Sequence, residues 1–260
     1  MEYVLGRPSR PVGGLLDRTY IGFAQPAGTQ ESWLATPGTS VTVIINLGAP
    51  FGALPRSFAA GLTDTAGVVE QNGEIECVDL KFTPIGAYAL LGVPMDELTG
   101  RVVDLEELPG FRELTERVAE RSSWDGRFAL IDRFLLDRLE RAPRPADEVA
   151  FAWRRLAATR GAQPIGALAE EVGWSRRHLV AKFRQQVGLP PKTIARILRF
   201  QHLLGRLRSG PVDLTRLAAE CGYYDQSHLN RDFREFAGIT PGDYLARMVT
   251  NVQYSWVSAA

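Results

Sequence analysis

The sequence predicts an α+β fold in which a β-rich N-terminal half with some helices precedes an all-helical C-terminal half. Three observations favour this class. Short β-branched runs concentrate in residues 1–83, helical periodicity dominates after Asp147, and Pro143 and Pro145 separate the two patterns. A chain of 260 residues is also long enough for two domains. We therefore expect the chain to divide at these prolines.

Composition narrows the class of protein further. Hydrophobic residues make up 45% and charged residues 23%, which is typical of globular proteins. The sequence contains no apolar run of about 18 residues, so we expect no membrane span. The first residues lack the basic start and apolar stretch of a secretory signal. Cys77 and Cys221 are then best interpreted as reduced thiols in a cytoplasmic protein.

The first predicted elements are strands. The run 41–47 is short and β-branched, which is typical of a strand. Apolar runs at 68–70 and 75–82 flank Asn72-Gly73, a dipeptide that favours a tight turn between paired strands. The pattern predicts a β-hairpin here.

Helices follow the strands. Pro84 suits the first position of a helix that ends before Gly92. Two more helices are predicted over 110–121 and 125–141. The second carries an apolar stripe at three- and four-residue spacing, formed by Phe128, Ile131, Leu135 and Leu139.

Beyond the prolines, every predicted element is a helix. Helices are expected at 148–160, from Pro164 to Val172, and from Ser175 to Gly188. A further helix is expected over 191–208, where apolar residues cover more than half of the circumference and require burial on several sides. Its length, about 27 Å, is on the scale of one DNA turn. The remaining stripe carries Arg199, His202 and Arg206.

An internal repeat is the strongest signal in the sequence. Leu168–Trp174 is echoed by Leu217–Tyr223 at an offset of 49 residues, and the segment 178–191 is echoed by 228–241 at an offset of 50. Each copy consists of a helix, a turn with Gly, a capped helix, and then Gly and Pro. This is the layout of a helix–turn–helix unit.

The second helix of each copy has two different faces. Ser175 and Asp225 are the predicted N-caps. The pairs Leu179/Phe183 and Leu229/Phe233 face the core at i, i+4 spacing. The opposite faces carry Arg176, Arg177 and Val180 in one copy and Gln226, Ser227, Asn230 and Arg231 in the other.

Charge is distributed unevenly over a chain whose net charge is zero. Residues 147–260 hold 16 Lys and Arg against 10 Asp and Glu, whereas residues 1–146 hold 14 against 20. An acidic half joined to a basic half is typical of nucleic-acid-binding proteins, although ordinary surface scatter is the alternative.

With these motifs in register, residues 150–250 resemble the AraC/XylS family of bacterial transcription regulators. The segments that carry the resemblance are Leu168 to Pro191 and, more diagnostically, Ala218 to Tyr244, with Gly222-Tyr223-Tyr224-Asp225-Gln226-Ser227-His228-Leu229 at its centre. The resemblance implies two recognition helices in successive major grooves of DNA.

Residue roles also follow from this resemblance. It assigns base reading to Arg176, Arg177, Val180, Ala181, Gln226, Ser227, Asn230 and Arg231, and phosphate contacts to Arg184, Lys192 and Arg234. Ala181 departs from the family, which often has Arg there. We therefore expect Val180 and Ala181 to contact thymine methyl groups instead.

The N-terminal half resembles the sensor half of an actinobacterial-type subgroup of these regulators, through Phe82–Pro94 and Glu97–Gly100. The family implies a β-barrel-like (cupin-like) domain that binds a small-molecule effector or forms a homodimer, and RNA polymerase as a further partner. The expected organisation is a sensing or dimerisation domain at 1–142, a linker at 143–148, a DNA-binding domain at 149–250 and a tail at 251–260.

A candidate effector pocket is lined by aromatic residues of the N-terminal half: Trp33, Phe51, Phe58, Phe82 and Tyr88. The alternative, which we favour, is that these residues form the core. All three histidines, His178, His202 and His228, lie in the C-terminal half, so we expect no cupin-type metal site and no cofactor. His178 and His228 occupy equivalent repeat positions, which favours a structural role.

The sequence therefore predicts a sequence-specific regulator that binds double-stranded DNA and responds to a small-molecule effector, and not an enzyme. The competing hypothesis is a barrel enzyme or ligand-binding protein whose helical domain binds a protein partner. The charge asymmetry, the tandem repeat and the lack of a catalytic constellation favour DNA binding.

Overall fold

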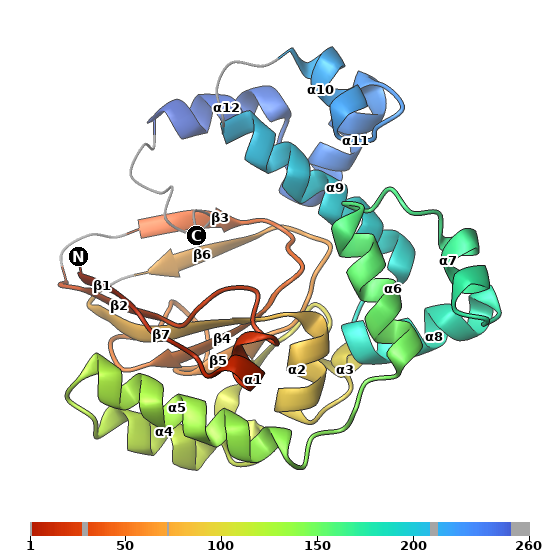
Figure 1. Ribbon diagram of the computed structural model, residues 1–260. Coiled ribbons are helices and arrows are strands. Elements are labelled where there is room, and N and C mark those ends of the chain that lie inside the picture. The colour runs from red at the N-terminus through yellow and green to blue at the C-terminus, as the bar shows by residue number, and fades with distance from the viewer. Residues whose placement is uncertain (1, 28–30, 72, 209–212, 251–260) are drawn as a thin grey trace.

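A six-stranded antiparallel sheet organises the N-terminal half in the computed structural model, which describes residues 2–27, 31–71, 73–208 and 213–250 (Figure 1). Its strands, in spatial order, are β1 (Glu2–Leu5), β2 (Ile21–Gln25), β7 (Ile75–Phe82), β4 (Val41–Asn46), β5 (Phe58–Ala60) and β8 (Val102–Asp104). A separate antiparallel pair consists of β3 (Glu31–Ala35) and β6 (Gly67–Gln71). The α+β class is confirmed, and the described strands form two open sheets and no closed barrel.

The large sheet is covered on both faces. Alternation along β4 and β7 directs Val43 and Leu80 to one face, where they join a core with the helices, and Ile44 and Cys77 to the other. On this second face Trp33 of β3 and Val69 of β6 pack against a smaller apolar cluster. The sheet therefore lies between helices and the two-stranded sheet (Figure 1).

The hairpin predicted around Asn72-Gly73 is wrong. β6 pairs with β3, and β7 pairs with β2 on one edge and β4 on the other. Because both edges of β7 are occupied, β6 has no free edge there to pair with. Asn72 itself lies outside the described residues.

Three helices of the N-terminal half lie close to their predicted bounds: α2 (Pro84–Leu91), α4 (Phe111–Ala119) and α5 (Trp124–Leu139). The structure adds three short ones that the sequence did not predict: α1 (Arg10–Gly13), α3 (Met95–Leu98) and the 3₁₀ helix η1 (Leu105–Glu107). Pro84 is the first residue of α2, and Gly92 ends the helix with a left-handed φ of 74°. The side chain of Thr83 caps α2 by accepting a hydrogen bond from the Gly86 N–H.

The apolar stripe of α5 is used within the chain. Phe128, Ile131 and Leu135 are buried in the core that the helices share with the sheet. Arg138 anchors the end of α5 by donating hydrogen bonds to the carbonyl oxygens of Pro109 (2.7 Å) and Leu91 (3.1 Å). This stripe therefore does not offer a free surface for a partner, and dimerisation stays a prediction.

The C-terminal half is entirely helical where the structure describes it. Its helices are α6 (Asp147–Ala158), α7 (Ile165–Glu171), α8 (Arg176–Val187), α9 (Pro191–Arg208), α10 (Leu214–Glu220), α11 (Gln226–Ala237) and α12 (Pro241–Thr250). The two prolines fall in the segment between α5 and α6. The predicted tail, 251–260, lies outside the described residues.

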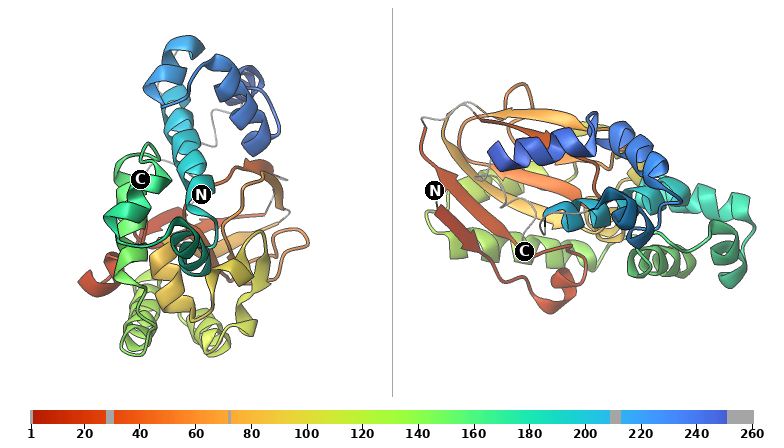
Figure 2. Two further views of the ribbon diagram at one scale, coloured as in Figure 1. Left: turned by 90° about the vertical axis from the view of Figure 1, so that its right-hand side faces the viewer. Right: turned by 90° about the horizontal axis from the view of Figure 1, so that it is seen from above.

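The two halves pack against each other through α8 (Figures 1 and 2). Helices α2 and α3 both contact α8. Thr99 Oγ1 donates a hydrogen bond to the Gly188 carbonyl oxygen at 2.9 Å, and the Ala146 N–H donates one to Gln186 Oε1 at 3.0 Å. Buried apolar residues of both halves form one continuous cluster. The first repeat unit is therefore fixed to the N-terminal half.

Candidate nucleic-acid interface

The first helix–turn–helix unit consists of α7, a turn at Gly173, and α8. Ser175 caps α8, because its Oγ accepts a hydrogen bond from the His178 N–H at 3.2 Å. Leu179 and Phe183 are fully buried. The predicted base-reading residues of this unit lie on the outer side of α8: Arg176, Arg177 and Ala181 are exposed, and Val180 is half-buried.

The second unit repeats this construction with α10 and α11. Asp225 caps α11, because its Oδ1 accepts a hydrogen bond from the His228 N–H at 2.7 Å. Leu229 and Phe233 are fully buried. Of the predicted base-reading residues, Ser227 and Arg231 are exposed and Gln226 and Asn230 are half-buried. Both units therefore present a polar helix face outward.

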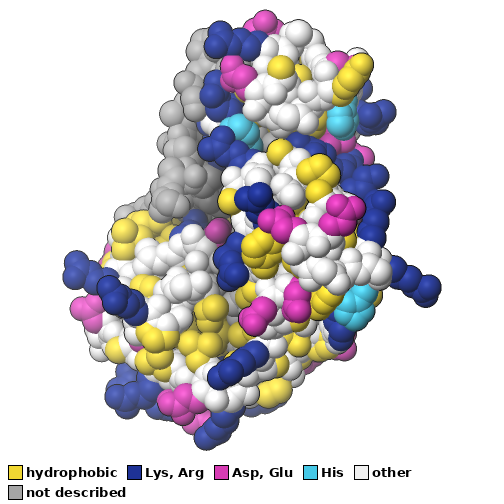
Figure 3. Space-filling view, turned by 45° about the vertical axis from the view of Figure 1, so that its right-hand side comes forward, with side chains coloured by type: hydrophobic (Ala, Val, Ile, Leu, Met, Phe, Trp, Pro, Cys, Tyr) yellow, Lys and Arg dark blue, Asp and Glu magenta, His cyan; other side chains and the backbone are white. Residues whose placement is uncertain are grey.

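The predicted phosphate contacts are also exposed. Arg184 lies on α8, Arg234 on α11, and Lys192 is the second residue of α9. Figure 3 shows Lys and Arg side chains along the right-hand edge of the molecule, over the C-terminal helices. The cations are therefore available to a polyanion.

Helix α9 holds the second unit in place through an ion-pair cluster. Arg196 donates hydrogen bonds to Asp232 Oδ1 (2.9 Å) and Glu235 Oε1 (2.8 Å) on α11. The hydrogen bond to Glu235 is the main cause of a raised Arg196 pKa, and the same bond lowers the pKa of Glu235. The ring centres of Phe200 on α9 and Phe233 on α11 lie 5.3 Å apart. Helix α9 is thus a rigid support for α11.

The polar stripe of α9 bonds within the protein. Arg199 donates to the Gly161 carbonyl oxygen at 3.2 Å, and Arg206 pairs with Glu220 at 2.8 Å. His202 Nε2 lies 3.0 Å from Arg160 Nη1. Burial, followed by the nearby arginines, lowers the pKa of His202. These residues therefore fix α9 between the two units.

His178 and His228 have equivalent surroundings. The ring of His178 meets Trp174 edge-on at 4.5 Å, and the ring of His228 meets Tyr223 in the same way at 5.3 Å. Each pair closes the turn that precedes its recognition helix. This similarity supports the predicted structural role.

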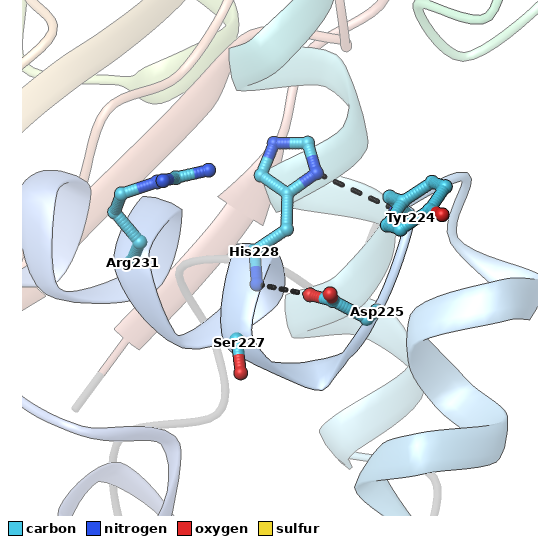
Figure 4. A pocket seen from close by; sticks show the side chains of 5 residues that line it. All are labelled: Tyr224, Asp225, Ser227, His228 and Arg231. Atoms are coloured by element: carbon cyan, nitrogen blue, oxygen red, sulfur yellow. Dashed lines mark hydrogen bonds between the residues drawn. The ribbon is translucent and has the colours of Figure 1, made fainter.

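A shallow recess of about 400 Å³ lies at the start of α11 (Figure 4). It is lined by Tyr224, Asp225, Ser227, His228 and Arg231. It brings together Ser227 and Arg231, two predicted base-reading residues. Tyr224 was not among the predicted site residues, although the change of repeat offset from 49 to 50 falls next to it.

A second recess lies between α3 and α8. Its lining contains Asp96 and Glu97 of α3, and Ala181 and Lys182 of α8. Acidic side chains of the N-terminal half therefore lie beside a predicted base-reading position. Sequence periodicity gave no sign of this contact.

The candidate effector residues divide between the two faces of the sheet. Phe51 and Phe58 are buried in the smaller cluster, with ring centres 6.1 Å apart, and Trp33 packs against them. Phe82 is buried in the other cluster, and Tyr88 packs against that one. The structure brings the first three residues together and separates them from the last two.

Cys77 is buried, and burial raises the pKa of its thiol. The described residues contain no group of three or more His, Cys, Asp or Glu that could hold a metal ion. None of the described helices combines the length and the apolar character needed to cross a membrane.

Comparison with known families identifies a domain within the C-terminal half. Residues 168–247 match a family model described as a helix-turn-helix domain. This part of the chain is an AraC-type helix-turn-helix domain. Residues 168–247 include both predicted recognition helices, α8 and α11, and the helix α9 between them.

Curated relatives match a part of the chain of similar length. The HTH-type transcriptional activator RhaR of Yersinia pseudotuberculosis is 34% identical over 73 residues, covering 28% of this chain and 25% of RhaR. The F1 operon positive regulatory protein of Yersinia pestis is 32% identical over 80 residues, covering 31% of this chain and 27% of that protein. The chain thus matches about a quarter of the length of these relatives.

A solved structure, ToxT from Vibrio cholerae, aligns over 88% of this chain and 98% of ToxT, with a TM-score of 0.46 and 9% identity.

Proposed function

We propose that this chain is a sequence-specific transcriptional regulator that binds double-stranded DNA through α8 and α11. The observation that carries the proposal is the duplicated unit: each copy has a capped helix that buries a Leu and a Phe and exposes a polar face. Helix α9 joins the copies with 18 residues, a spacer of about 27 Å. That length is comparable with the spacing of successive major grooves on one face of DNA.

The proposal also assigns a regulatory role to the N-terminal half. We infer that residues 1–142 bind a small-molecule effector or mediate homodimerisation, and that residues 143–148 link them to the DNA-binding domain at 149–250. The apolar cluster around Trp33, Phe51 and Phe58 is the candidate effector region. RNA polymerase is the proposed partner at the promoter, and the cytoplasm the proposed location.

Two single substitutions test the assignment of the helix faces. Arg231 is exposed on α11, where a guanidinium can donate two hydrogen bonds to guanine O6 and N7. Arg231→Ala should cost about 1–3 kcal/mol on the specific duplex and less on random DNA. Lys192 is exposed at the start of α9, where it suits a phosphate. Lys192→Ala should weaken both duplexes alike and reduce the salt slope by about one.

The duplexes come from selection with the wild-type full-length chain on a random-sequence library, and a scrambled version is the comparison. Affinity is measured at several salt concentrations. Equal weakening of both duplexes by Arg231→Ala would show that this face does not read bases. A wild-type chain with no salt-dependent binding would favour the competing hypothesis of a helical domain that binds protein.

A further inference from the structure

The turn of the second unit contains one residue more than the turn of the first. The Trp174 N–H donates a hydrogen bond to the Ala169 carbonyl oxygen at 3.0 Å, and the Tyr223 N–H donates the matching bond to Ala218 at 2.9 Å. Both rings then pack edge-on against the histidine of their own unit. Trp174 and Tyr223 are therefore structural equivalents, 49 residues apart.

The capping residues are equivalent at a different offset. Ser175 follows Trp174 directly and accepts from the N–H three residues on, as Asp225 does in the second unit. These two caps are 50 residues apart. The residue between Tyr223 and Asp225, which is Tyr224, has no counterpart in the first unit.

The inserted residue does not contribute to the core. The side chain of Tyr224 is 93% exposed, whereas its neighbour Tyr223 is 4% exposed. An exposed aromatic ring at the start of a helix that enters the major groove can make an apolar contact with a thymine methyl group. Tyr224 is thus available at the point where α11 begins.

The backbone at this position is nevertheless held in place. The Tyr224 N–H donates a hydrogen bond to His228 Nδ1 at 3.4 Å, and the next residue is the N-cap. The ring of Tyr224 borders the same recess as Ser227 and Arg231 (Figure 4). A fixed backbone and a shared recess place this ring beside the predicted base-reading face.

We propose that Tyr224 is a specificity-determining residue that contacts a base in the major groove beside the base read by Arg231. The contact is apolar, between the ring of Tyr224 and the methyl group of a thymine, a group that only A·T pairs display in that groove. This inference rests on the proposed function. It also gives the second unit a base contact that the shorter turn of the first unit lacks.

The test uses the full-length chain and a duplex selected by the wild-type protein. Tyr224→Ala should lose affinity for the selected duplex by about tenfold and for a scrambled duplex by much less. Tyr224→Phe keeps the ring and should bind as the wild type does. Tyr3→Ala, the same truncation at an exposed tyrosine of β1, is the matched control and should change neither affinity.

The DNA gives a second measurement that does not depend on protein folding. Each thymine of the selected duplex is replaced in turn by deoxyuridine, which removes only the methyl group. At one position this replacement should weaken wild-type binding but leave Tyr224→Ala binding unchanged.

Two results would overturn the inference: wild-type affinity of Tyr224→Ala for the selected duplex, or equal losses on both duplexes, which would indicate a backbone contact. If the wild type itself did not distinguish the two duplexes, the proposed function would fail instead.

Discussion

Capping residues determine where each recognition helix starts. Ser175 and Asp225 accept hydrogen bonds from N–H groups that the first helical turn leaves without partners. In α8 the cap is followed by Arg176 and Arg177, although the helix dipole disfavours cations in a first turn. A DNA phosphate or base bound there would offset that cost. The exposed arginines are thus better explained by binding than by stability.

His202 gives a prediction on pH at the residue scale. Its pKa is lowered by burial and by Arg160 and Arg206, so the folded state favours the neutral ring. Below the ordinary histidine pKa of about 6.5 the unfolded chain therefore takes up a proton that the folded chain does not, and the free energy of unfolding falls. His202→Gln removes this group but keeps an oxygen acceptor for Arg160.

Urea unfolding from about pH 7.5 to about 5.5 measures the effect, because a histidine changes its charge in this range. The wild type should lose more stability on acidification than His202→Gln. Parallel curves for the two proteins would show that His202 is not the cause.

At the scale of elements, the sequence predicted helix bounds best, because capping residues, prolines and glycines act locally. The bounds 191–208 for α9, the start of α8 after Ser175 and the end of α2 before Gly92 were all predicted, because caps, prolines and glycines act within one turn. The sheet was less predictable. The choice of a partner for β6 depends on which edges are free in the folded sheet, and neighbouring residues such as Asn72-Gly73 do not reveal it.

Gly188, which follows α8, gives a prediction at this scale. Its φ of +104° is unfavourable for other residues, and an added Cβ would lie 3.2 Å from Thr99 Oγ1 and 3.3 Å from the Met95 carbonyl oxygen. Gly188→Ala should therefore lower the free energy of unfolding by about 1–3 kcal/mol.

Gly166 in α7 is the control, since an added Cβ there meets nothing within 4 Å and Ala favours a helix by about 0.5–1 kcal/mol. The free energy of unfolding, measured by chemical denaturation, should fall for Gly188→Ala and rise for Gly166→Ala. Unchanged stability of Gly188→Ala would mean that α3 and α8 are not tightly packed.

At the scale of the whole molecule, the outward faces of α8 and α11 could be predicted from the sequence. The elements that pack beside these faces could not. Helical spacing and the repeat identified Arg177, Ser227 and Arg231 as outward residues, and they are exposed. The contact of α3 with α8 joins segments about 85 residues apart, and no periodic signal marks such a contact. In the sequence, the offset between the two repeat copies changes from 49 to 50 next to Tyr224. The exposure of the Tyr224 ring became clear only from the structure.

The recess between α3 and α8 predicts an electrostatic effect on DNA binding. Asp96 and Glu97 lie beside Ala181, so phosphates near this part of α8 would be repelled. Removing both charges with Asp96→Asn and Glu97→Gln should strengthen binding by about two- to fivefold at low salt, and less at high salt.

Glu116→Gln with Glu120→Gln is the control, because it makes the same change of charge at exposed positions at the end of α4. Affinities measured at low and high salt compare the two double variants. Equal affinities of the two double variants would mean that DNA binding depends on the net charge of the protein and not on the position of the α3 carboxylates.

The most direct test of DNA binding by α8 and α11 is the salt dependence of wild-type affinity for a selected and a scrambled duplex. About six phosphate contacts would give a slope of log affinity against log salt near −5. We predict that slope, together with tighter binding of the selected duplex at every salt concentration. A slope near zero, or equal affinity for the two duplexes, would contradict sequence-specific DNA binding.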